Sequence, residues 1–79
     1  MTLDQLATGI AARIASVDWS VLAEDEAKRL QALGIDAGAE VRIAHRGIFL
    51  GRDPLAVQLG AMTVALRRCH ARAIAIDAE

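Results

Sequence analysis

The side chains of this 79-residue sequence that could bind a transition metal are His45, Cys69, His70 and, weakly, Met62. Imidazole and thiolate groups bind zinc, iron and copper. Cys69 and His70 are adjacent, however, and cannot easily chelate one ion with good geometry, and no second pair has a spacing typical of a metal site. We expect Cys69 to be a small buried hydrophobic residue and His45 to lie partly exposed at a strand end. We therefore predict no metal site and no cofactor, while metal binding by His45, Cys69 or His70 stays open as an alternative.

Catalytic motifs are missing from the sequence. There is no glycine-rich loop before a predicted helix, no lysine placed for a phosphate, and no nucleophile–base pair suggested by spacing. The acidic run Glu24–Glu26 lies near the start of a predicted helix, where the helix dipole favours carboxylates, and we expect it on a solvated face. We predict that the protein has no catalytic residues and is not an enzyme.

A run of large apolar residues lies in a predicted loop, with a glycine and then an arginine on each side. Exposed apolar loops are costly without a partner, and such patches often carry the binding energy of an interface. The alternative is that Phe49 or Leu50 folds back and closes one end of the core. The predicted partner-binding residues are Arg46, Ile48, Phe49, Leu50 and Arg52.

Composition argues against several other functions. The net charge is −1, and the large rings are one Trp and one Phe, whereas small barrels that bind nucleic acid combine a basic groove with stacking aromatics. The lone Cys69 cannot form an internal disulfide, which fits a reducing compartment. No signal peptide and no apolar run of roughly 20 residues is visible. We predict a cytoplasmic protein without membrane insertion that does not bind nucleic acid.

The elements that position these residues follow from local patterns. Thr2-x-x-Gln5 is a capping box and predicts a short N-terminal helical turn. Alternation of Ile10, Ala12 and Ile14 predicts a first strand that ends near Val17.

The main helix is predicted from Ser20, as its N-cap, to Leu33, with Trp19 stapled against its first turns. Ala23, Ala27, Leu30 and Leu33 line one face. Gly34 stands where a left-handed residue ends a helix, and Ile35 can fold back onto the last turn.

After Gly38 the apolar period changes to two. Strands are predicted through Val41 and Ile43, over 55–59, over 62–66 after a tight Gly60-Ala61 connection, and over 73–77, with a helical turn over 67–71. So few residues favour a mainly β fold in one domain over residues 1–79: a small SH3-like β-barrel of about five strands with one main α-helix after the first strand. An unpaired barrel edge leaves a weak homo-oligomer as an open alternative.

Taken in order, these residues resemble one family, the FeoA proteins of bacterial ferrous iron transport. The helix end Arg29-Leu30-x-x-Leu33-Gly34-Ile35 with Gly38 is similar to that of the family, whereas Ala37 replaces a frequent proline and His70 a frequent acid. The other matching residues are Leu3, Leu6, Gly9, Ile14, Gly51, Asp53, Pro54, Leu55, Val64, Leu66, Arg67, Ala71 and Ile74.

The resemblance implies a cytoplasmic SH3-like accessory protein that assists FeoB, the membrane ferrous iron transporter with a GTP-binding domain, by protein contact and not by catalysis. The same fold occurs as the C-terminal domain of iron- and manganese-dependent repressors. The alternative function is therefore a stand-alone SH3-like interaction domain that modulates a metal-responsive regulator.

Overall fold

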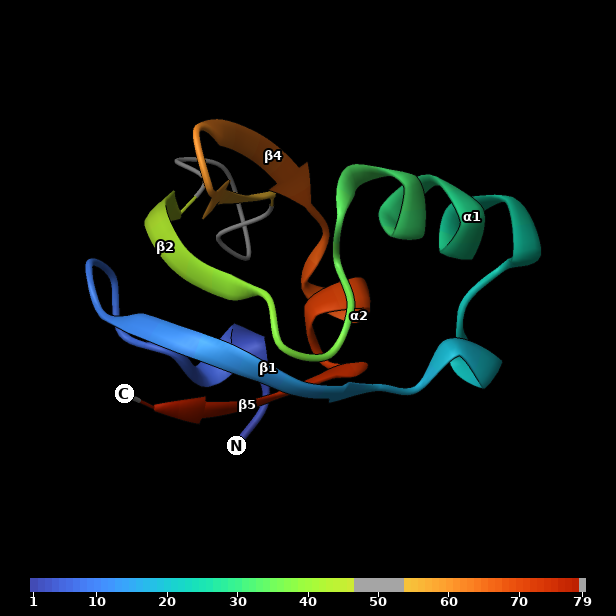
Figure 1. Ribbon diagram of the computed structural model, residues 1–79, viewed down its shortest axis with the longest axis horizontal. Helices are drawn as coiled ribbons and strands as arrows, with labels where there is room; N and C mark the ends of the chain where they lie inside the picture. The colour runs from blue at the N-terminus through green and yellow to red at the C-terminus, as the bar shows by residue number, and fades with distance from the viewer. Residues whose placement is uncertain (47–53, 79) are drawn as a thin grey trace.

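A computed structural model of the chain describes residues 1–46 and 54–78, and its centre is one antiparallel sheet of five strands (Figure 1). The strands lie in the order β4-β3-β2-β1-β5, so consecutive strands β2, β3 and β4 are neighbours while β5 returns to pair with β1. The sheet bends at register shifts between Ile14 and Ser16 and between Ile43 and His45, since an extra residue in one strand increases its local twist. The strands are β1 Ala11–Val17, β2 Glu40–Arg46, β3 Leu55–Leu59, β4 Met62–Leu66 and β5 Ile74–Ala78.

The core is built from alternate strand residues. Val41 and Ile43 of β2 are buried, and Leu55, Val57 and Leu59 repeat the pattern on β3, as their period of two predicts. In the described part of the chain no polar or charged residue is buried. The core cluster consists of Leu3, Leu6, Ala12, Ile14, Leu30, Ile35, Val41, Ile43, Leu55, Val57, Leu59, Leu66, Ala71, Ile74 and Ile76.

The main helix, α1, spans Glu24–Leu33 and begins later than the sequence predicts. Ser20 does not cap it: its backbone N–H and hydroxyl both donate to Asp18 Oδ1, at 3.2 and 2.5 Å, and Asp18 thereby caps a separate 3₁₀ turn, η2, over Trp19–Val21. The chain is then extended at Leu22 and Ala23 before α1 starts. Trp19 packs against the core from η2 and is not the residue that precedes the N-cap, which is Ala23.

The end of α1 has the predicted Schellman geometry. Gly34 has φ +102°, its N–H donates to Gln31 O at 3.0 Å, and Ile35 N–H donates to Leu30 O at 3.0 Å. Ile35 is fully buried and Leu30 is the buried residue of α1, whereas Ala27 and Leu33 are half-buried and Ala23 is exposed. The predicted apolar face is therefore narrower than its sequence pattern indicates.

The remaining elements are short. The N-terminal turn η1, Leu3–Gln5, has Gln5 Oε1 accepting from Thr2 N–H at 3.2 Å, as its capping-box pattern predicts. Ile10 precedes β1 and is 47% exposed, so its assignment to the core alternation was wrong. The turn α2, Arg68–Ala71, leads into β5 (Figure 1). Five strands, one main helix after the first of them and a short N-terminal turn confirm the predicted mainly β fold.

Candidate functional site

The predicted partner-binding loop connects β2 to β3. The two strands pair up to Arg46 and Leu55, the last partners of their ladder, so the loop starts and ends at a fixed strand pair. Arg46 closes β2, while Ile48, Phe49, Leu50 and Arg52 lie outside the described residues.

The candidate metal ligands lie on different elements: His45 is in β2, and Cys69 and His70 are in α2. His45 is exposed near the end of β2, as the sequence predicts. Cys69 is exposed, which corrects the expectation of a buried thiol: the four-residue turn α2 buries Ala71 against the core and leaves Cys69 on its outer side. His70 is half-buried in the same turn.

A charged cluster links α1 to α2. Glu26 Oε1 accepts hydrogen bonds from Arg29 Nε at 3.1 Å and Nη2 at 2.5 Å, and His70 Nδ1 lies 3.5 Å from the same oxygen. The hydrogen bond and charge of Arg29, with smaller contributions from His70 and Arg67, hold the pKa of Glu26 below its usual value against the opposing effect of burial. The same hydrogen bond raises the pKa of Arg29.

The sequence predicts only part of this cluster. The spacing of Glu26 and Arg29 is that of a helical i,i+3 pair, but the approach of His70 depends on how α2 packs. The expectation that Glu24–Glu26 form one solvated face is wrong for Glu26, which is half-buried, and correct for Glu24 and Asp25, which are exposed.

The cluster does not make a metal site. His70 Nδ1 is buried and makes no hydrogen bond, but the carboxylate it faces already accepts from Arg29, whose positive charge opposes a cation there. Within residues 1–46 and 54–78 no three His, Cys, Asp or Glu side chains come close enough to hold an ion.

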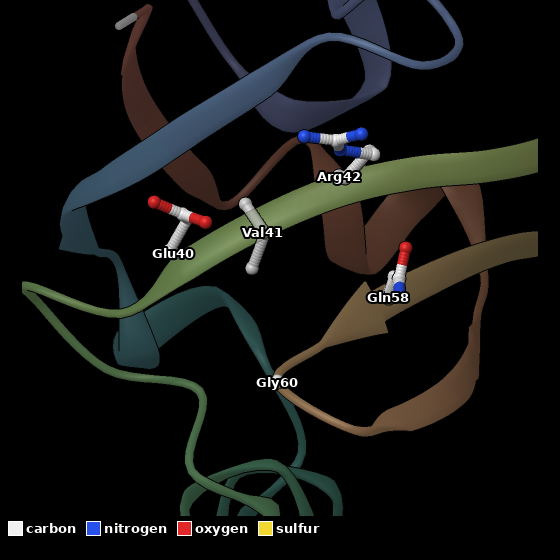
Figure 2. A pocket seen from close by; sticks show the side chains of 5 residues that line it. All are labelled: Glu40, Val41, Arg42, Gln58 and Gly60. Carbon is white, nitrogen blue, oxygen red and sulfur yellow. The ribbon is translucent and has the colours of Figure 1, made fainter.

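A shallow polar groove of about 300 Å³ crosses the outer face of the sheet at the start of β2 and the end of β3 (Figure 2). Arg42 and Gln58 are cross-strand partners, and both side chains extend to the same side. Glu40 lines the groove on the same strand as Arg42. The register pairs Glu40 with Arg13, whose guanidinium also donates to Gly38 O at 3.0 Å. Such a surface suits polar contact with a macromolecule.

No helix among the described residues is long and apolar enough to span a membrane. The polar groove lies on the surface of the small sheet.

The similarity to known proteins extends over nearly the whole chain. The family model of the FeoA domain matches residues 1–78. A search of curated proteins found no match. Among solved structures, the FeoA of Stenotrophomonas maltophilia, complexed with zinc and described as an SH3 domain protein, is 38% identical over 98% of this chain and 89% of its own, with a TM-score of 0.80.

Two further structures extend the comparison. The FeoA protein of Chlorobium tepidum is 31% identical over 99% of this chain and 70% of its own, with a TM-score of 0.82. A manganese-dependent transcriptional repressor shares the fold at 20% identity and a TM-score of 0.82, with all of this chain covering 41% of the repressor. Since the family model covers nearly all residues and the FeoA structures superpose along the same length, the chain belongs to the FeoA family of ferrous iron transport.

Proposed function

We propose that this protein is a non-enzymatic cytoplasmic accessory of ferrous iron uptake that binds the cytoplasmic domains of a FeoB-like transporter. One observation carries the proposal: the FeoA match over residues 1–78, together with 38% identity to a FeoA described as possibly acting as a ferrous iron transport activating factor. Family membership supports the pathway, and the exposed polar groove of the sheet is consistent with a protein that acts through contact.

The proposed contact is the loop between β2 and β3, with Ile48, Phe49 and Leu50 as its apolar part. Arg46 and Arg52 bracket it in the sequence and would interact with carboxylates around an apolar pocket on the transporter. Because the loop is attached to paired strands at Arg46 and Leu55, it has a rigid base from which to dock.

The test measures binding of the full chain to the isolated cytoplasmic domains of the transporter by calorimetry. The double substitution Ile48→Ser and Phe49→Ser should weaken binding at least roughly tenfold, which corresponds to about 1.4 kcal/mol. The matched control is Val21→Ser, an apolar residue of η2 that is 65% exposed, and it should leave the affinity unchanged.

Thermal unfolding of each variant separates the outcomes. If the double variant no longer folds, the loop belongs to the core and is not the contact. If the wild-type chain shows no binding in any nucleotide state of the transporter, the proposed function is overturned.

The second candidate is a stand-alone domain that modulates a metal-responsive regulator. It is favoured only by the shared fold with the manganese-dependent repressor, which at this identity supports architecture alone. Binding to such a regulator, in place of the transporter domains, would favour it.

A further inference from the structure

The outer edge of β5 is covered by the N-terminus of the chain. Ile76 N–H, which points away from β1, donates to Met1 O at 2.9 Å, and Thr2 forms an antiparallel bridge with Ala75 (Figure 1). Leu3 is fully buried and fixes this segment to the core, and Asp4 Oδ2 lies 3.8 Å from Arg72 Nε.

The outer edge of β4 can be derived from its pairing with β3. The two-residue connection Gly60-Ala61, with φ +61° at Gly60, makes Leu59 and Met62 a hydrogen-bonded pair. Hydrogen-bonded pairs recur at every second position, so the backbone groups of Val64 and Leu66 also face β3. Those of Thr63 and Ala65 therefore face away from the sheet.

These outward groups have no partner within the described part of the chain. No backbone hydrogen bond there reaches Thr63 or Ala65 from outside the sheet, and both residues are exposed. The strand Met62–Leu66 also contains no charge and no proline, the residues that usually protect an edge from pairing. Met62 is 46% exposed at its start.

We propose that β4 pairs antiparallel with β4 of a second copy of this chain, about a two-fold axis at Val64. In this register the outward groups of Thr63 on one copy meet those of Ala65 on the other, and the two-fold repeats the same exchange in reverse. Met62 then lies opposite Leu66 of the second copy, which covers an exposed apolar side chain. The strand is thus complementary to itself in hydrogen bonding and in polarity.

The charges near β4 do not oppose this arrangement. Arg67, the residue after β4, falls opposite Ala61 of the second copy, so the two Arg67 residues lie at opposite ends of the joined strands, about 20 Å apart at ~3.4 Å per residue. A single strand pair buries less area than a standard stable interface, so the dimer is weak and reversible. The inference does not depend on the proposed transporter contact.

The first experiment is sedimentation equilibrium of the full chain from micromolar to millimolar concentration. The wild-type protein should show a monomer–dimer equilibrium. Ala65→Pro removes an outward N–H and should weaken the dimer at least about tenfold, whereas Ala65→Ser retains that N–H and should change the dissociation constant less than about twofold. Thr63→Lys places a charge on the edge and should also abolish the dimer. Ala32→Lys, at an exposed position of α1, should not.

The second experiment tests the register and does not require the proline variant to fold. Cys69, which is exposed, is first replaced by Ser in Thr63→Cys and Ala65→Cys chains. Oxidising the mixture should give the 63–65 disulfide-linked dimer in excess over either chain alone, since directly opposite residues have the Cα separation a disulfide needs.

A wild-type chain that stays monomeric at millimolar concentration overturns the proposal. So does a dimer that survives both Ala65→Pro and Thr63→Lys, or a mixture without excess of the 63–65 species. A monomeric chain whose β4 variants weaken binding to the transporter domains would also overturn it and assign the edge to a strand of that partner.

Discussion

The two edge strands of the sheet, β4 and β5, are both five-residue strands and differ in what lies outside them. On β5 the outward N–H of Ile76 donates to Met1, and the preceding residue bridges to Thr2. On β4 the corresponding groups of Thr63 and Ala65 have no partner in the described part of the chain. Among residues 1–46 and 54–78, the N-terminal segment therefore pairs with the edge of β5, whereas no described residue pairs with the edge of β4.

The most disruptive test of this comparison contrasts two neighbouring positions of β4. Val64→Pro should lower the free energy of unfolding by at least about 3 kcal/mol, because the N–H of Val64 faces β3 and its side chain is 7% exposed. Ala65→Pro, one residue further, should cost about 1 kcal/mol or less, because its N–H faces outward. Urea denaturation measures both, and equal losses would show that the derived orientation of the strand is wrong.

The covered edge can be weakened through its anchor. Leu3→Ala should lower the free energy of unfolding by about 3 kcal/mol, since it removes a fully buried side chain and leaves a cavity beneath the N-terminal segment. Met62→Ala on β4 is the matched control and should cost under about 1 kcal/mol, because Met62 is 46% exposed. Thermal and urea unfolding measure both variants. Similar losses of unfolding free energy would contradict the comparison.

Amide hydrogen exchange compares the edges without any substitution. The Ile76 amide should exchange at least roughly tenfold more slowly than those of Thr63 and Ala65 at low protein concentration, because it is bonded to Met1 O. Raising the concentration into the range of the proposed dimer should slow the Thr63 and Ala65 amides and leave Ile76 unchanged. Fast exchange at Ile76 would mean that the N-terminus does not close its edge in solution.

The smallest effect concerns the charged cluster, which lies on neither edge. The pKa of Glu26 is lowered by Arg29, so its contribution to stability is present above the unfolded pKa of about 4.3 and is lost as pH falls through the lower folded pKa. Glu26→Gln should therefore cost about 0.5 kcal/mol at pH 7 and nothing in strong acid, as expected for a solvent-screened pair.

Glu24→Gln is the control for this substitution. Its partner Lys28 lies at 3.3 Å with both side chains largely exposed, so the change in unfolding free energy should be smaller at every pH. A pH-independent loss in Glu26→Gln would assign the role of Glu26 to packing and not to charge.

Local patterns predicted much of the fold because the signals and the final structure agree. The alternation of Leu55, Val57 and Leu59 and the Gly34–Ile35 helix stop depend on nearest neighbours, and both are found as expected. The start of α1 was missed because Ser20, its expected N-cap, is held by Asp18 in the separate turn η2. The Ser20 hydroxyl donates to Asp18, so Ser20 does not cap α1. Ala23 takes the N-cap position without a side-chain hydrogen bond.

The exposure of Cys69 and the contact between His70 and Glu26 could not be predicted from the sequence for a different reason. Both depend on which side of the short turn α2 faces the core, and only the packing of Ala71 decides that. The coverage of β5 by Met1 is likewise a contact between the two ends of the chain, which no local pattern reports. The predicted loop residues Ile48, Phe49 and Leu50 stay a prediction.

The bond between Met1 and Ile76 also has a consequence for how this fold can be used as a module. It places Met1 beside β5, the last strand of the sheet, as Figure 1 shows for the N-terminus. A unit whose entry and exit points are adjacent can be spliced into a host chain with little distortion, or circularly permuted by joining those points and opening the Gly60-Ala61 hairpin turn. Such geometry suits a fold that also occupies 41% of a longer repressor chain.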